Sequence, residues 1–223
     1  HVAVLWGEGG AFCAGWDLKF VSSLSPEILD RELSFPDRDP DDPNAVPRGP
    51  LGPTRLELSK PVIAAVAGPA VAGGMELALW CDIRVMEEDA YFGVYCRRWG
   101  VPLIDGGTVR LPRLVGQGRA LEIILTGRKV PAEEALRIGA CEEVVPAGES
   151  RAAAERIAQQ IARFPQVCVR ADRRSAIAQH GLSVREAMKA EWRGGRAPMR
   201  HEAVEGAARF ARGLGRHGDF GEI

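Results

Sequence analysis

The segment KPVIAAVAGPAVAGGMELALWCD, which runs from Lys60 to Asp82, decides the fold of this chain. Its first part, Pro61 to Ala67, is continuously apolar and rich in β-branched residues, which is typical of a strand buried on both faces. Gly68 ends that strand. Two further glycines, Gly73 and Gly74, let the backbone approach a ligand closely, and good helix-forming residues follow them. The segment therefore predicts a buried strand that leads through a tight turn into a helix.

The helix start expected at Gly73 and Gly74 is a candidate oxyanion-binding site. The first N–H groups of a helix have no partner inside it, and the helix dipole adds partial positive charge there. An oxyanion suits such a position, and the carboxylate of Glu76 follows as a candidate acid or base. The segment alone leaves an alternative open, in which the glycines only allow tight packing and Glu76 is solvated or paired with the helix dipole.

A second stretch, GGAFCAGWDLK from Gly9 to Lys19, also runs through glycines into an expected helix. The apolar residues from His1 to Trp6 supply the strand ahead of it. Two such turns in one domain can each donate one N–H group to the same carbonyl oxygen, which polarises that oxygen more than either turn alone. The two stretches together predict a pair of donor turns with a carboxylate beside them.

Both stretches resemble signatures of the crotonase (enoyl-CoA hydratase/isomerase) superfamily. Ala11 to Lys19 is similar to the AFCAGxDLK signature, and Lys60 to Asp82 follows the companion signature KPVIAAVxGxAxGGGxELAxxCD almost position for position. The resemblance covers most of residues 1 to 145 and continues through Ala90–Gly93, Gly106–Gly116, Leu125–Arg128 and Ala132–Ala135. It implies the crotonase (ClpP-like) α/β fold, built from repeated ββα units with a C-terminal helical region.

The resemblance also implies an enzyme that binds an acyl-CoA thioester and stabilises its enolate. Coenzyme A is then part of the substrate, and no separate cofactor is expected. The superfamily hosts hydratases, isomerases, decarboxylases, dehalogenases and hydrolases on one scaffold. Enoyl-CoA hydration is favoured because Glu76 aligns with the first catalytic glutamate of the hydratases. Two alternatives stay open: double-bond isomerisation or another crotonase-type reaction, and a homologue that binds acyl-CoA or a partner without turnover.

Residue by residue, the resemblance places the two oxyanion-hole donors on the backbone N–H groups of Trp16 and Gly73. A tryptophan is larger than the usual small residue at the first position, so its side chain either shapes the acyl pocket or packs in the core. The segment that includes Trp16 is expected to lie along coenzyme A, with Lys19 a candidate for its phosphates or adenine and an exposed helix lysine as the alternative. The implied substrate-binding residues are Ala14, Asp17, Leu18, Lys19 and Gly74.

One position departs from the hydratase pattern. By ungapped counting from Glu76, the second hydratase glutamate falls on Cys96. Hydration needs one group to take a proton from water and another to deliver a proton to carbon, and a thiol with an ordinary pKa of about 8.5 is a poor substitute for a carboxylate. Asp105, set among apolar residues, is the candidate replacement, and the dienoyl-CoA isomerases and dehalogenases of the family resemble this placement. An aspartate ahead of two glycines can equally be a turn or N-cap residue.

The composition indicates a soluble domain with one sizeable core. The chain has 223 residues, of which 46% are hydrophobic, and no apolar run long enough to cross a bilayer. Its 29 basic residues nearly balance its 30 acidic ones, so neither nucleic acid nor a membrane is an expected partner.

The five cysteines lack metal-ligand spacing, and an odd number without a signal peptide indicates reduced thiols in the cytoplasm. The four histidines share no ligand spacing either, so no metal site is expected.

The elements are expected to form a crotonase α/β core over residues 1–145, with a Pro-rich loop at about 26–53, and a helical oligomerisation or capping region over 146–223. Strands are expected over His1–Trp6, Val62–Val66, Ile83–Met86, Tyr91–Val94 and Glu142–Val145, and helices over Trp16–Leu24, Gly74–Trp80, Gly107–Leu114, Ala120–Leu125 and Ala132–Ile138. Proline spacing excludes a helix from most of the loop, except around Glu27 to Leu33. The loop is expected to lie at the mouth of the site or to be surface filler.

The C-terminal region has a helical pattern. Ser150 is expected to cap a helix that Pro165 closes, and further helices are expected over Val169–Gln179, Val184–Trp192 and His201–Arg212. This region resembles the family's trimerisation and active-site-capping layer, which implies a homotrimer or a hexamer made of two trimers. Family members usually begin with a further strand–helix unit, so the resemblance also implies an N-terminal unit that would precede His1.

Overall fold

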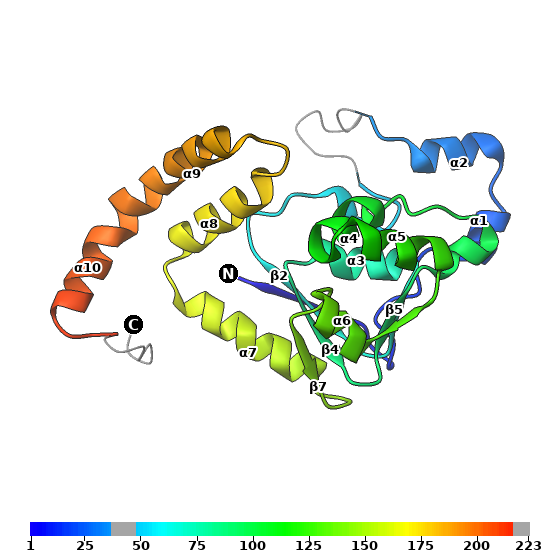
Figure 1. The fold of residues 1–223 in the computed structure, drawn as a ribbon, viewed down its shortest axis with the longest axis horizontal. Helices are drawn as coiled ribbons and strands as arrows, with labels where there is room; N and C mark the ends of the chain where they lie inside the picture. The colour runs from blue at the N-terminus through cyan, green and yellow to red at the C-terminus, as the bar shows by residue number, and fades with distance from the viewer. Residues whose placement is uncertain (37–47, 216–223) are drawn as a thin grey trace. The chain divides into compact units, whose positions relative to one another are not determined.

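The computed structural model describes residues 1–36 and 48–215 (Figure 1). Within them the chain forms two compact units. The first, which we call the α/β unit, comprises Val4–Leu58 and Val62–Glu155, and the second, the helical unit, comprises His1–Ala3, Ser59–Pro61 and the chain from Arg156 onward. Residues 37–47 of the Pro-rich loop lie outside the described residues. The prediction that this part of the loop contains no helix therefore stays a prediction.

A sheet of four strands organises the described part of the α/β unit. Its order is β1 (Ala3–Trp6), β2 (Val62–Val66), β4 (Ile83–Glu87) and β7 (Glu143–Val145). β4 runs parallel to both β2 and β7, with Ile63 opposite Ile83 and Val85 opposite Glu143. All five residues of β2 are buried. This confirms the strand, buried on both faces, that the apolar run predicts.

A smaller sheet brings the two glycine turns of the chain together. It consists of β3 (Pro69–Val71), β5 (Tyr91–Gly93) and β6 (Lys129–Pro131), with β5 parallel to β3 and antiparallel to β6. Cys13 forms a parallel bridge with Ala70 of β3. Neither β3 nor β6 was expected from the sequence, because each has only three residues and contains a proline, too little to display an alternating pattern.

The helices of the α/β unit mostly begin and end close to the predicted residues. They are α1 (Leu18–Ser22), α2 (Pro26–Leu33), α3 (Gly73–Trp80), α4 (Gly107–Val115), α5 (Gln117–Thr126) and α6 (Ala132–Ile138), with short 3₁₀ turns η1 (Pro53–Arg55) and η2 (Tyr95–Trp99). α1 starts later than expected because the Asp17 carboxylate caps it by accepting the Lys19 N–H. Gly139 follows α6 in the left-handed conformation, which ends the helix. Figure 1 shows α4 packed beside α3.

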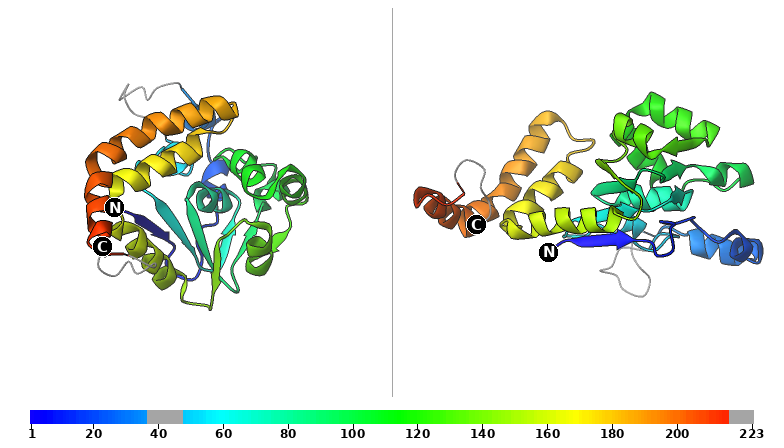
Figure 2. Two further views of the ribbon diagram at one scale, coloured as in Figure 1. Left: turned by 60° about the vertical axis from the view of Figure 1, so that its left-hand side comes forward. Right: turned by 90° about the horizontal axis from the view of Figure 1, so that it is seen from below.

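The C-terminal helices are α7 (Ser150–Arg163), α8 (Gln166–Ala178), α9 (Val184–Pro198) and α10 (Val204–Ala211), and the π turn η3 (Met199–Ala203) joins the last two. α8 and α9 lie side by side (Figure 2). The helix expected over His201–Arg212 therefore corresponds to the end of η3 and to α10, which continue from α9. No helix in the described ranges is long and apolar enough to cross a membrane.

Ser150 begins α7, but not as the capping residue that the sequence predicts. Its hydroxyl and its N–H both donate to Oε1 of Glu87, at 2.7 and 3.4 Å. The carboxylate at the end of β4 therefore caps this helix through a tertiary contact. A comparable contact serves α8, since the Glu202 carboxylate accepts the N–H groups of Val167 and Cys168 at 3.0 and 2.8 Å.

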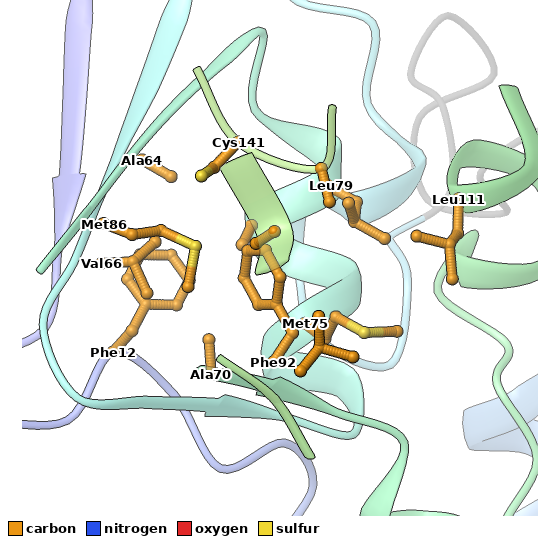
Figure 3. Packing of buried hydrophobic residues seen from close by; sticks show 14 of the residues in the cluster. Phe12, Ala64, Val66, Ala70, Met75, Leu79, Met86, Phe92, Leu111 and Cys141 are labelled. Carbon is orange, nitrogen blue, oxygen red and sulfur yellow. The ribbon is translucent and has the colours of Figure 1, made fainter. Parts of the chain in front are cut away.

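The hydrophobic core of the α/β unit lies between its sheets and helices. Figure 3 shows Val66, Met86 and Phe92, which come from three different strands, with Met75 and Leu79 of α3. All five side chains are almost fully buried. Because α3 is held in this core, the start of the helix has a fixed position relative to the strands.

We expect the contact between Gly74 and the Gly9–Lys19 stretch to be sensitive to a single methyl group. A Cβ at Gly74 would overlap the carbonyl oxygen of Cys13, whereas one at Gly118 in α5 would meet nothing within 4 Å. Gly74→Ala should therefore lower the free energy of unfolding by about 1–3 kcal/mol. Gly118→Ala should leave it unchanged or raise it by up to about 1 kcal/mol. Thermal and denaturant unfolding of both variants test this, and equal effects would contradict it.

Candidate active site

Backbone contacts hold the two glycine turns against each other. The Cys13 carbonyl accepts the Val71 N–H at 3.0 Å, and the Cys13 N–H donates to Pro69 at 3.3 Å. A Cβ at Gly15 would lie only 2.9 Å from the Gly73 nitrogen. A side chain at Gly15 or at Gly74 would collide with the backbone of the opposite turn, so each turn needs a glycine at this position.

Two backbone donors are free where the turns meet. Within the part of the chain that the structure describes, neither the Trp16 N–H nor the Gly73 N–H donates to a protein acceptor. Gly73 is the first residue of α3, so its N–H belongs to the unpaired first turn. Ala72 precedes it with a φ of 54°, the one positive φ among the described residues other than glycine. This unusual backbone conformation directs the chain into the helix.

Trp16 and Gly73 line one cavity of about 100 Å³, together with Glu76, Cys96 and Asp105. Of the residues expected to bind substrate, Ala14 and Leu18 also line it. The other three do not. Asp17 and Lys19 lie on the exposed start of α1, and Gly74 is buried against Cys13. Aromatic and aliphatic side chains complete the wall: Leu51, Tyr95, Trp99, Val101, Pro102 and Ile104.

Glu76 is a buried carboxylate fixed by two backbone donors. Its Oε1 accepts the N–H of Asp105 at 2.9 Å and that of Gly107 at 2.7 Å, and only 2% of the residue is exposed. Oε2 accepts no hydrogen bond from the described residues, and Glu76 lines the cavity. The carboxylate thus has one anchored oxygen and one available oxygen.

The surroundings of Glu76 raise its pKa from 4.5 to about 7. Burial is the largest cause, because it disfavours the charged form, and the nearby Asp105 carboxylate acts in the same direction. The hydrogen bonds from Gly107 and Asp105 oppose this shift. A carboxyl group that changes its protonation state near neutral pH can both accept and deliver a proton.

Asp105 is buried in the same cavity but is tied to a neighbouring turn. Its Oδ1 accepts the Leu51 N–H at 3.1 Å and the hydroxyl of Thr54. Arg110 of α4 donates to its main-chain oxygen at 2.8 Å. No donor in the described residues reaches Oδ2. Asp105 directly precedes Gly106, the N-cap residue of α4, so it is a turn residue, and it also lines the cavity.

Cys96 lies in η2, lines the cavity and is almost fully buried. Burial raises the pKa of its thiol, and the Glu76 charge raises it further. The thiol is therefore protonated at neutral pH and does not supply a second ionised group. Sequence reasoning identified Cys96 but missed Leu51, Thr54 and Arg110, whose roles come from contacts with residues distant in the chain.

Comparisons with known proteins agree with this fold. The model of the family described as enoyl-CoA hydratase/isomerase matches residues 1–214. Enoyl-CoA hydratase EchA19 of Mycobacterium tuberculosis is 35% identical over 216 residues, which cover 93% of this chain and 75% of that protein. The enoyl-CoA hydratase/isomerase YngF of Bacillus subtilis is 39% identical over 170 residues, which cover 75% of this chain and 60% of that protein.

The crystal structure of an enoyl-CoA hydratase from Bacillus anthracis superposes with a TM-score of 0.82 at 32% identity, over 95% of this chain and 78% of that one. The present chain thus spans 60–78% of the length of these three relatives. Fold and cavity define a crotonase-type enzyme. The chain belongs to the enoyl-CoA hydratase/isomerase family, which confirms the crotonase α/β fold and supports a function of the enoyl-CoA hydratase type.

We expect the protonation of Glu76 to appear as a pH dependence of stability. Between its ordinary pKa of 4.5 and about 7, the folded protein binds more protons than the unfolded chain, so the free energy of unfolding should fall as pH rises through this window. The whole shift corresponds to roughly 3 kcal/mol. Glu76→Gln cannot titrate but keeps an oxygen for both N–H groups. Its stability relative to the wild type should therefore increase with pH, and parallel curves from denaturant unfolding would contradict the shift.

Proposed function

We propose that this protein catalyses the reversible hydration of 2-enoyl-CoA thioesters. The observation that carries the proposal is the cavity that Glu76 shares with Trp16 and Gly73, because it combines a carboxylate of pKa about 7 with two free backbone donors. Membership of the enoyl-CoA hydratase/isomerase family supports the acyl-CoA substrate.

In this proposal the thioester carbonyl oxygen accepts the N–H groups of Trp16 and Gly73. These donors stabilise the enolate oxygen that develops during the reaction more strongly than the ground-state carbonyl. Ala14 and Leu18, which line the cavity, contact the substrate, and Gly74 keeps the turn close to it. The exposed side chains of Asp17 and Lys19 flank the coenzyme A moiety, with the Lys19 ammonium group available for a phosphate.

Glu76 and Asp105 carry the protons. The Asp105 carboxylate takes a proton from water while the oxygen of that water bonds to C3, and the electron pair of the double bond moves through C2 to the carbonyl oxygen. C2 of the enolate then takes a proton from Oε2 of Glu76, whose raised pKa favours the protonated form. The neutral Cys96 thiol takes no part in either transfer. No metal or separate cofactor is required.

Double-bond isomerisation of an enoyl-CoA is the second candidate, and the Cys96 thiol favours it. A single carboxylate that removes a proton at one carbon and returns it at another can shift a double bond, so the absence of a carboxylate at position 96 is tolerated. A protein that binds acyl-CoA without turnover is the third possibility. The products of an assay distinguish the three.

The assembly proposed for this enzyme is a homotrimer or a hexamer of two trimers in the cytoplasm. An exposed apolar stripe on α9 supports self-association, since Val184, Met188 and Trp192 are 77%, 61% and 65% exposed. The five free cysteines are compatible with a reducing compartment.

The reaction is tested by incubating the protein with a 2-enoyl-CoA and a 3-enoyl-CoA and following mass and retention time. We expect the 2-enoyl substrate to gain one water. An unchanged mass with a shifted double bond would establish isomerisation instead, and no change in either substrate would favour another acyl-CoA reaction or binding alone.

The roles of the cavity residues are tested with near-isosteric variants. Glu76→Gln should lower kcat by about a hundredfold to ten-thousandfold with little change in ligand affinity, because only the proton transfer is lost. Asp105→Asn keeps an oxygen for Leu51 and Thr54, so a loss of about a hundredfold would report the acid–base role. Cys96→Ala should stay within a few fold of the wild type. Steady-state kinetics measure all three, and a large loss in Cys96→Ala would overturn the assignment.

A further inference from the structure

Leu51 lies directly against the proposed carbonyl site. A Cβ at Gly73 would overlap Cδ1 of Leu51, so this methyl group occupies the space next to the donor residue. Leu51 also lines the cavity that contains Glu76. An acyl chain whose carbonyl oxygen is held by the Gly73 N–H therefore passes Leu51 with its first carbons.

The turn that carries Leu51 is fastened to Asp105. The Leu51 N–H and the Thr54 hydroxyl donate to the same oxygen, Oδ1, of this carboxylate. Thr54 is 1% exposed, so its hydroxyl donates to Asp105 without competition from bulk water. Gly49 and Gly52 close the turn with two reciprocal N–H to carbonyl bonds of 2.9 and 2.8 Å.

Two arginines secure the same turn. Arg110 of α4 donates from Nη2 to the Thr54 carbonyl at 2.7 Å and from Nη1 to the Asp105 carbonyl at 2.8 Å, so it bridges the turn and the helix start. Arg55 donates from Nη1 to the carbonyl oxygens of Ser34 and Arg48, at 2.8 and 3.1 Å. These bonds restrict how far the Leu51 side chain can withdraw from the cavity.

We propose that Leu51 is a specificity-determining residue that limits the substrate to short, slender acyl chains. Thr54 and Arg110 are positioning residues that act through it, and Asp105 positions the same turn with Oδ1. The inference rests on the proposed function for its substrate. An apolar wall discriminates by bulk, and one methylene group in such a pocket changes kcat/KM by about tenfold to two-hundredfold.

The test compares kcat/KM for trans-2-octenoyl-CoA with that for trans-2-butenoyl-CoA. Leu51→Ala should raise this ratio by about tenfold or more, and the smaller truncation Leu51→Val should raise it less. Leu56→Ala is the matched control, because Leu56 lies on the same segment, is also half-buried and does not line the cavity. An unchanged ratio in folded Leu51→Ala and Leu51→Val, or an equal rise in Leu56→Ala, would overturn the proposal.

The positioning role is tested at Thr54. Thr54→Val keeps the shape but removes the hydroxyl donor to Asp105, and it should raise the same ratio, whereas Thr54→Ser should retain the wild-type ratio. A residue with a purely structural role would lower both kcat/KM values together. A wild-type ratio in Thr54→Val would therefore remove Thr54 from the proposal.

The affinity for saturated acyl-CoA thioesters tests the role of Leu51 independently of the proposed hydration reaction. Calorimetric titration with octanoyl-CoA and butanoyl-CoA, which cannot react, measures the acyl limit without turnover. If the wild type hydrates neither enoyl substrate but Leu51→Ala gains about tenfold in octanoyl-CoA affinity relative to butanoyl-CoA, the acyl limit stands and the hydratase proposal fails. If hydration occurs and neither ratio changes, the hydratase proposal stands and the role of Leu51 fails.

Discussion

The backbone contact between Cys13 and β3 is the interaction on which the rest of the site depends. It places two turns, distant in the chain, so close together that Gly74 has no room for a side chain beside the Cys13 carbonyl. The start of α3 is held by this contact on one side and by the core around Met75 on the other. Both free donors and the Glu76 carboxylate therefore belong to a single rigid arrangement.

The chemistry of Glu76 follows from a balance of opposing effects. Burial and the charge of Asp105 favour the protonated form, and the two backbone donors on Oε1 favour the ionised form. Burial prevails by enough to bring the pKa to about 7. Because Gly107 both donates to Glu76 and begins α4, the residue that starts the helix also limits the rise in the pKa of Glu76.

Local patterns allowed the strand β2, the helix α3 and both glycine turns to be predicted, because each lies within one short segment of the sequence. The contacts of Leu51 and Thr54 could not be predicted in this way, since both residues bind Asp105, which is 51 residues from Thr54 in the chain. The same limit explains Ser150, whose partner Glu87 is brought to it only by the folded sheet. For Asp105, the sequence offered a turn residue or an acid, and only the tertiary structure shows that its Oδ1 holds the turn at Leu51 and Thr54 while the residue also lines the cavity.

The positive φ of Ala72 has a consequence for how the donor at Gly73 works. A non-glycine residue in a sparsely populated backbone region costs about 1–3 kcal/mol, and the surrounding structure has to hold it there. That energy is spent once, when the chain folds. In the proposed reaction, the Gly73 N–H is therefore already aimed before the substrate arrives, so the reorganisation energy that a flexible donor would add to each turnover is absent.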